Sequence, residues 1–402
     1  MENPKIRFKG FTKDWEQRKF GEVFQEYSEK NHPELPALTI IQGGGTVLRE
    51  ESDRNLQYNK SSLSGYKMVC ENDFIVHLRS FEGGLEKSNH KGLISPAYHT
   101  FHGDNVDSRF YYPYFRSYEF IKHKLVPHVY GIRDGRSIDI DGMKTIEIPY
   151  TSYEEQKKIG DYIQSLDHLI TLHQRKCEQT KNLKKYMLQK MFPQNGAKVP
   201  EIRFNGFTHD WEQRKLGDLV DRVTRKNQDL VSELPLTISA QYGLIDQNEF
   251  FDKRVASKDV SGYYLIENGE FAYNKSTSTD APWGAIKRLD RYENGVLSTL
   301  YIVFGIKENN PVDSDFLVSY YSTNLWHKGI NEIAAEGARN HGLLNIAPAD
   351  FFQTRLMIPQ DIEEQKKIGK YFIELEALIT LHQRQCDELK KMKKYMLQNM
   401  FI

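Results

Sequence analysis

The chain is poor in cysteine and has no long hydrophobic run. Its three cysteines are Cys70, Cys177 and Cys386, and their spacing does not match a metal site. We interpret them as reduced, buried thiols. A membrane-spanning helix needs about 18 or more consecutive apolar residues, and the sequence has no such run. The opening MENPKIRFKG lacks the apolar centre of a signal peptide, so we expect a cytoplasmic protein.

A net charge is also missing, as are the common catalytic motifs. The 55 basic residues balance 55 acidic residues, so any surface for nucleic acid has to be local. The sequence contains no dinucleotide-binding or Walker-type glycine loop, no Gly-x-Ser-x-Gly elbow and no His-Glu-x-x-His. It also lacks the Asn-Pro-Pro-aromatic or Asp-Pro-Pro-Tyr tetrapeptide that cradles an amine during methyl transfer. We therefore expect no catalytic residues and no metal site in this chain.

What the sequence does contain is an internal duplication. The segment 4–21, PKIRFKGFTKDWEQRKFG, recurs near the middle of the chain with 14 of 18 positions identical. The segment 154–192 recurs without a gap at 363–401, with 26 of 39 positions identical. The stretches between these copies, 22–153 and 218–362, are hard to align with each other. A duplicated scaffold that carries two different modules indicates a protein that reads two unlike half-targets.

The two repeated tails are predicted to be long helices. Their apolar residues recur three and four positions apart, which is the spacing of a stripe that faces a partner, and neither tail has an internal proline. A helix of about 37 residues is roughly 55 Å long, which is more than one domain needs, so we expect the two helices to pair. The residues predicted to pair them are Ile159, Leu166, Leu169, Ile170, Leu183, Met187, Ile368, Leu375, Leu378, Ile379, Leu389 and Met396.

The two modules have the pattern of mixed, strand-rich structure. Short apolar runs are bounded by Gly, Asn, Asp and Pro, and some landmarks recur, such as GYKMVCENDFIV and GYYLIENGEFAY. The sequence therefore predicts an α/β fold of the α+β kind, in which a strand-rich module followed by a long helix occurs twice. The predicted boundaries are 1–153 for the first module, 154–192 for the first helix, 193–361 for the second module and 362–402 for the second helix.

Candidate DNA-binding residues follow a strand that both modules share. Lysine and hydroxyl groups suit phosphate, whereas Arg and Asn can bind guanine and adenine bidentately. The predicted contacts are Arg79, Ser80, Lys87, Asn89 and Lys91 in the first module and Asn274, Lys275, Ser276, Thr277, Ser278 and Thr279 in the second. An ordinary polar loop is the alternative for either segment, but their shared position favours a function.

A second candidate surface comes later in each module. It consists of Tyr130, Arg133 and Arg136 in the first module and of Arg339, Asn340 and His341 in the second. These residues again combine guanidinium groups with an aromatic ring or an amide, so we predict direct DNA contact for them as well.

The repeated motifs resemble those of one known family. The opening Phe-x-Gly-Phe-x-x-Asp-Trp-Glu-x-x-Lys/Arg and the helix start Glu-Glu-Gln-Lys-Lys-Ile-Gly each occur twice, around the two divergent modules. In this layout the chain resembles the specificity subunit of a type I restriction-modification system, from Ile6 to Phe401. We interpret the tryptophans of the repeated opening, Trp15 and Trp211, as packing residues.

The resemblance implies that each module is a target-recognition domain that reads one half of a split, asymmetric site in double-stranded DNA. It implies that the helices pair antiparallel, give the chain a pseudo-two-fold arrangement and act as the spacer. It also implies two methyltransferase (modification) subunits and additional restriction subunits as partners. Adenine methylation, DNA translocation and cleavage would belong to those partners, together with S-adenosylmethionine, ATP and Mg²⁺, while this chain would bind no cofactor.

Two other functions stay open from the sequence. A protein scaffold would use the same helices and variable modules without reading DNA. An autonomous DNA methyltransferase or nuclease would need a cofactor pocket hidden in the divergent modules, and S-adenosylmethionine binding by the isolated chain would reveal it. Exchange of one module distinguishes the scaffold, because only a DNA reader would change its sequence preference.

Overall fold

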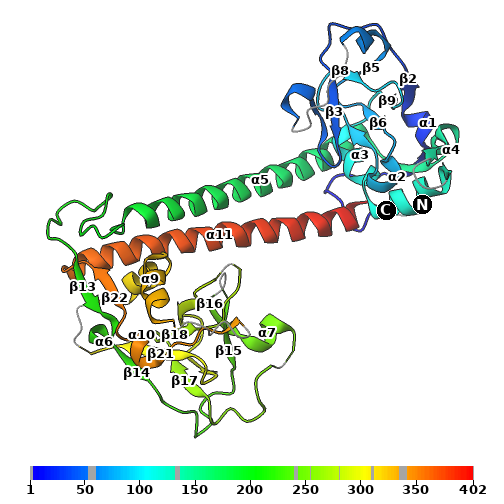
Figure 1. Cartoon of the computed structure of the whole chain (residues 1–402). Helices are drawn as coiled ribbons and strands as arrows, with labels where there is room; N and C mark the ends of the chain where they lie inside the picture. Colours follow the sequence, from blue (N-terminus) through cyan, green and yellow to red (C-terminus); the bar gives the residue numbers. More distant parts are fainter. Residues whose placement is uncertain are drawn as a thin grey trace. The chain divides into compact units, whose positions relative to one another are not determined.

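The computed structural model places each variable module in a separate unit of the chain (Figure 1). Unit 1 comprises Met1–Gln174 and Gln383–Ile402, and unit 2 comprises Arg175–His382. Each unit therefore contains one module and one end of each long helix. The described residues are 3–52, 60–131, 136–239, 243–253, 255–279, 281–308, 312–334 and 342–401. No helix in these ranges has an apolar stretch long enough to cross a membrane.

The module of unit 1 is built around a four-stranded antiparallel sheet. Its strands, in spatial order, are β2 (Gln25–Tyr27), β9 (His99–His102), β6 (Phe74–Val76) and β7 (Glu86–Lys87). The two-stranded pairs are β1 (Glu16–Lys19) with β12 (Glu147–Tyr150), β3 (Leu38–Ile41) with β4 (Gly45–Leu48), β5 (Lys67–Val69) with β8 (Gly92–Ile94), and β10 (Val129–Tyr130) with β11 (Ser137–Ile138). The short helices are α1 (Phe20–Val23), α2 (Ser80–Gly83), α3 (Ser108–Phe115), α4 (Ile140–Lys144), the π-helical η3 (Phe120–Leu125) and the 3-10 turns η1 (Arg49–Glu51), η2 (Lys60–Gly65) and η4 (Val126–His128).

The module of unit 2 has the same strand order despite its different sequence. Its four-stranded sheet runs β14 (Val220–Val223), β21 (Ile302–Ile306), β18 (Phe271–Asn274) and β19 (Ala285–Arg288). The two-stranded pairs are β13 (Glu212–Lys215) with β22 (Arg355–Ile358), β15 (Leu236–Ser239) with β16 (Gly243–Asp246), and β17 (Tyr264–Glu267) with β20 (Asn294–Leu297). The helices are α6 (Leu216–Leu219), α7 (Gln247–Phe251), α8 (Ser314–Tyr321), α9 (Leu325–Ile333) and α10 (Pro348–Phe351). The prediction of a duplicated α+β module is confirmed.

Aromatic side chains fill both cores, but they make different contacts. In unit 1, Phe74 meets Phe115 edge to face with ring centroids 4.9 Å apart. In unit 2, Phe271 stacks on Phe304 at 5.4 Å, and Phe304 also contacts Phe351. Cores of similar volume tolerate such repacking while the backbone path stays the same. This explains why the modules share a topology although their sequences are hard to align.

The long helices are α5 (Tyr153–Lys190) and α11 (Ile362–Met400), close to the predicted ranges (Figure 1). Within each unit their ends pair antiparallel. In unit 1, Ile159 and Ile163 share a core with Met400. In unit 2, Lys184 donates to Glu376, and the thiol of Cys177 lies 3.8 Å from the carbonyl oxygen of Ile379. The second contact is earlier in α5 but later in α11 than the first, so the two helices run antiparallel.

The residues that face the partner helix follow a strict alternation of four and three positions. On α5 they are Ile159, Ile163, Leu166, Ile170, His173, Cys177, Thr180, Lys184 and Met187, and on α11 they are Ile368, Phe372, Leu375, Ile379, His382, Cys386, Leu389, Lys393, Met396 and Met400. We call these residues the seam. Cys177 and Cys386 are buried in it as free thiols, whereas Cys70 is half-buried.

Three predicted pairing residues lie outside the seam. Leu169, Leu183 and Leu378 keep 39%, 45% and 45% of their surface exposed. Each of them precedes a seam residue by one position, and one residue turns a helix by about 100°. The predictions for these three leucines were therefore wrong, because a spacing of three or four residues admits two adjacent positions such as Leu169 and Ile170.

Candidate nucleic-acid interface

The repeated sequence motifs build a polar junction between each module and its helix. In unit 1 the carboxylate of Glu155 accepts hydrogen bonds from Arg7 at 2.6 and 2.8 Å and from the Trp15 indole at 3.1 Å. Trp15 and Glu155 are each only 1% exposed, so the prediction that Trp15 packs in the core is confirmed. The Glu155 carboxylate raises the pKa of Arg7 because it accepts hydrogen bonds from the charged guanidinium.

Unit 2 repeats this junction with the equivalent residues. Glu364 accepts from Arg203 at 2.7 and 2.8 Å and from the Trp211 indole at 3.3 Å. Trp211 is also 1% exposed. A buried carboxylate is tolerated only when donors surround it, which explains why the opening motif and the helix motif recur together.

The next residue of the helix motif, Gln156 or Gln365, ties the helix to the module. The Gln156 side-chain oxygen accepts from the amide of Asp107 at 3.0 Å, and Gln365 accepts from the amide of Asp313 at 2.8 Å. Asp107 and Asp313 are the N-cap residues of α3 and α8. Both glutamines are fully buried. The start of each long helix is therefore fixed to the start of a module helix.

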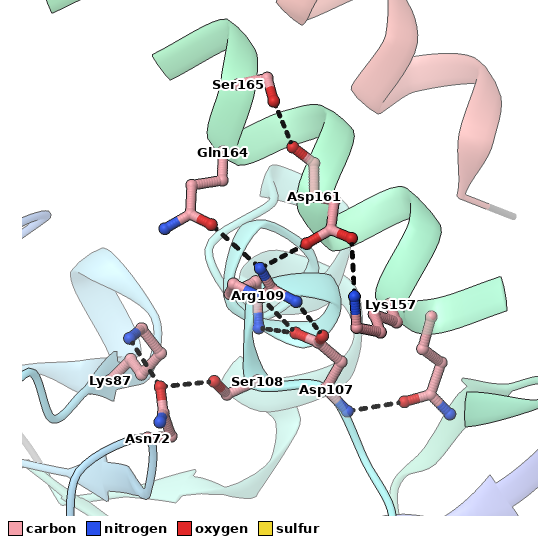
Figure 2. Close-up of polar contacts among 10 residues, drawn as sticks. Asn72, Lys87, Asp107, Ser108, Arg109, Lys157, Asp161, Gln164 and Ser165 are labelled. Atoms are coloured by element: carbon pink, nitrogen blue, oxygen red, sulfur yellow. Dashed lines mark hydrogen bonds and ion pairs between the residues drawn. The ribbon is translucent and has the colours of Figure 1, made fainter. Parts of the chain in front are cut away.

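A further network extends this junction in unit 1 (Figure 2). Arg109 of α3 donates to both carboxylate oxygens of Asp107, to Asp161 at 2.6 Å and to Gln164 at 3.0 Å. The carboxylates of Asp107 and Asp161 raise the pKa of Arg109, with the Asp107 hydrogen bonds as the main cause. Lys87, a predicted DNA contact, donates to Asn72 at 3.2 Å in the same view. Burial lowers the pKa of Lys87, so this ammonium is partly withdrawn from solvent.

The other predicted residues of the first segment divide between exposed and structural positions. Arg79 and Lys91 are exposed. Ser80 is fully buried, and its hydroxyl accepts from the amide of His77 at 2.9 Å, so the prediction that it contacts DNA is corrected. The Asn89 side chain donates to the carbonyl of Gly44 at 2.8 Å and thereby holds a neighbouring turn. Ser80 is buried because α2 begins there, where the sequence pattern indicated a loop.

The two candidate surfaces of unit 1 come together in the structure. The guanidinium of Arg136 lies 5.6 Å from the ring centroid of Phe81 in α2, the helix that follows Arg79. Tyr130 is 60% exposed on β10, whose partner strand β11 begins directly after Arg136. Arg133 lies outside the described residues. A cation over an aromatic face stabilises this contact between segments far apart in the sequence.

In unit 2 the first candidate segment contacts the residues that follow the second one in the sequence. After β18, the amide and hydroxyl of Thr277 donate to the carbonyl of Gly342 at 2.7 and 3.1 Å, and the amide of Leu344 donates to the carbonyl of Lys275 at 3.0 Å. Gly342 directly follows the predicted residues Arg339, Asn340 and His341, which themselves lie outside the described residues.

The remaining predicted residues of unit 2 fall into two groups. Ser276, Ser278 and Thr279 are exposed. Asn274 donates to the Tyr301 hydroxyl at 3.3 Å, and Lys275 is half-buried with its pKa lowered by burial. The sequence did not predict that distant segments meet in each module, because contacts between residues far apart in the sequence leave no signal in local spacing.

The helix ends of each unit carry a matching cross-helix ion pair. In unit 1 the Lys393 ammonium donates to Asp167, and in unit 2 that of Lys184 donates to Glu376, both at 2.5 Å. These four residues are equivalents in the sequence repeat. The duplication thus preserved one polar contact across the seam in each unit.

An exposed apolar stripe runs beside the seam in both units. It comprises Leu169, Met392 and Tyr395 in unit 1 and Leu183, Tyr186, Leu378 and Leu381 in unit 2, each 39–57% exposed. In unit 1 the hydroxyl of Tyr162 reaches the sulfur of Met392 at 3.7 Å, so the two helices contribute to one surface. Exposed apolar residues at equivalent positions of both units make this stripe a candidate surface for a protein partner.

The architecture defines a class of protein in which two mixed α/β modules alternate with two long helices whose ends pair antiparallel. A solved structure of this class is the type I restriction-modification S subunit from M. genitalium. It matches with a TM-score of 0.58 and 15% identity, over 100% of this chain and 99% of that chain. The chain thus has the fold of a type I S subunit.

Two weaker matches accompany this one. The HsdS subunit from Thermoanaerobacter tengcongensis matches with a TM-score of 0.45 and 15% identity, over 96% of each chain. A chain from a structure described as the basis of complex assembly and conformational transition of the type I R-M system matches with a TM-score of 0.42 and 16% identity, over 96% of this chain and 97% of that chain. No protein-family model and no curated protein matches the chain.

Proposed function

We propose that this chain is the DNA-recognition subunit of a type I restriction-modification complex. In this role each module reads one half of a bipartite, asymmetric target. The observation that carries the proposal is that the polar segment after the shared strand contacts a distant segment in both modules, with Arg136 on Phe81 in unit 1 and Thr277 on Gly342 in unit 2. The full-length likeness to an S-subunit fold supports the same role.

The differences between the two surfaces fit unlike half-targets. Unit 1 presents guanidinium groups at Arg79 and Arg136, which suit guanine, whereas unit 2 presents hydroxyls at Ser276, Ser278 and Thr279. The polar junctions at Glu155 and Glu364 are alike in both units. A common frame with different reading surfaces is the design expected of a bipartite reader.

In this proposal the long helices bind the partner subunits. One methyltransferase subunit docks on the apolar stripe of each unit, because the stripes are built from equivalent residues. The complex acts as a type I deoxyribonuclease and adenine-N6 methyltransferase in the cytoplasm, with restriction subunits added. S-adenosylmethionine, ATP and Mg²⁺ bind those partners and not this chain.

The helices also set the spacing between half-sites in this proposal. Four added residues lengthen a helix by about 6 Å, and one turn of 5.4 Å corresponds to roughly 1.6 base pairs of duplex. Insertion of four residues near Thr180 and four near Leu389 is expected to lengthen the unspecified spacer by one or two base pairs. Both half-sites should stay the same, and an unchanged spacer would show that the helices are not the ruler.

The experiment that tests the proposed function is the exchange of one module. Residues 22–153 are replaced by the corresponding segment of a chain with the same frame, and the complex with its methyltransferase subunits is assayed for methylated sequences. We expect one half of the target to change and the other half to persist. A scaffold without DNA readout predicts no change in either half.

A further inference from the structure

A glycine turn in unit 1 lies next to the candidate interface and was not among the predicted contacts. The turn Gln42–Gly44 joins β3 to β4 and is exposed. A Cβ built on Gly83 of α2 would lie 2.1 Å from the Gln42 side-chain nitrogen, so Gln42 lies against the helix that follows Arg79. The turn is therefore continuous with the surface formed by Arg79, α2 and Arg136.

The fully buried carboxylate of Glu86 binds the backbone amides of this turn. Glu86, which is 0% exposed, accepts from the amides of Gly43 at 2.8 Å and Gly45 at 3.1 Å. It also accepts from the Tyr112 hydroxyl at 2.7 Å and from the guanidinium of Arg116. Burial of a carboxylate is costly unless donors satisfy it, so these four donors fix its position and that of the turn.

A second set of bonds fixes the carbonyl groups of the same turn. The Asn89 side chain donates to the carbonyl of Gly44 at 2.8 Å and to that of Thr46 at 3.1 Å. The hydroxyl of Thr46 lies 3.0 Å from that of Ser88. Glycines are conformationally free and cannot fix a turn by themselves, so side chains of β7 and the residues after it impose the geometry.

The turn is exposed, and the Gln42 side-chain amide rests at this surface against Gly83 of α2. Gly43 has a φ of +82°, which favours glycine, and the absence of side chains at Gly43 and Gly44 allows another molecule to approach the backbone closely. The Gln42 side-chain amide packs against Gly83, and no hydrogen bond to it is found among the described residues. A glutamine amide can bind the N6 and N7 edge of adenine bidentately in the major groove.

We propose that Gln42 reads a base in the half-site of unit 1, and that Glu86 is the positioning residue that holds its turn. This inference rests on the proposed function and adds a specificity determinant to it. In the complex with its methyltransferase subunits, Gln42→Ala is expected to relax preference at one base pair of the first half-site by about 5- to 150-fold. Glu86→Gln is expected to relax the same base pair, and the second half-site should keep its preference in both variants.

The test is competition binding of the complex to duplexes with every single-base change in both half-sites. Gln17→Ala, an exposed glutamine on β1, serves as the matched control and should change nothing. A purely structural role of Glu86 would weaken binding to all duplexes equally, without a change at one base pair, and would overturn the positioning role. Unchanged preference in Gln42→Ala would overturn the inference and leave the proposed function intact. Failure of the proposed function itself appears differently, as a wild-type complex that binds all duplexes alike.

Discussion

The buried junction at Glu155 gives a quantitative prediction for unit 1. The carboxylate is 1% exposed and accepts from Arg7, from the Trp15 indole and from the Thr151 hydroxyl at 2.5 Å. Glu155→Gln removes the charge and leaves the mostly buried Arg7 guanidinium without its counter-ion. Breaking one side of a buried ion pair costs about 3–5 kcal/mol. A glutamine oxygen retains some of the hydrogen bonds, so we expect a loss near the lower limit, about 3 kcal/mol.

Hydrogen exchange with mass spectrometry checks this prediction unit by unit. A loss of about 3 kcal/mol corresponds to at least about 100-fold faster exchange by opening of β1 and α3. Glu364→Gln is the matched variant and should accelerate exchange in unit 2. Glu154→Gln, an exposed neighbour, should have little effect. Adding Arg7→Met to Glu155→Gln should cost less than the sum of the single changes, because the second change removes the unpaired charge.

Either of two results would contradict the coupling of Glu155 and Arg7 in the buried junction. Equal effects of Glu154→Gln and Glu155→Gln would show that the buried carboxylate has no special role. Strict additivity of Arg7→Met and Glu155→Gln would show that the pair is not coupled in the folded protein.

Two further predictions concern close packing and pH. A Cβ at Gly369 would lie 2.6 Å from the amide nitrogen of Phe316, whereas a Cβ at Gly160 would meet no atom closer than 3.1 Å. We therefore expect Gly369→Ala to destabilise unit 2 by about 1–3 kcal/mol in thermal unfolding. Gly160→Ala should be nearly neutral in the same measurement. The hydrogen bond that the protonated His102 ring donates to the Asp73 carboxylate raises the pKa of His102. The protonated histidine therefore stabilises the fold below its unfolded pKa of about 6.5, and this contribution disappears as pH rises through the higher folded pKa. His102→Gln should therefore lower the melting temperature at pH 5.5 more than above neutral pH, and an equal loss at both would exclude this linkage.

Local signals in the sequence were sufficient to predict the two long helices and the duplicated modules. The ranges of α5 and α11 follow from periodicity and from the absence of proline, both of which act within a few residues. The seam was less predictable, since Leu169 and Leu378 are also apolar but are exposed and lie one position away from it. Periodicity detects that a helix has apolar residues but does not separate two adjacent stripes.

The candidate interface needed tertiary structure. The segments at Arg79 and Arg136 meet only because the fold brings Phe81 under the second guanidinium. Ser80 and Asn89 have suitable chemistry for DNA, yet the fold uses Ser80 to hold His77 and Asn89 to hold the glycine turn. Whether a polar side chain is free to bind a ligand depends on contacts that sequence spacing does not encode.

The central claim is that this chain selects the DNA sequence that its partners modify. The most direct measurement is a genome-wide map of adenine methylation in cells that contain the chain and its methyltransferase partner, compared with cells that lack this chain alone. We expect a split, asymmetric methylation motif that disappears when this chain is absent. Methylation that persists unchanged, with the chain verified as expressed in the first cells, would contradict the claim and favour a scaffold.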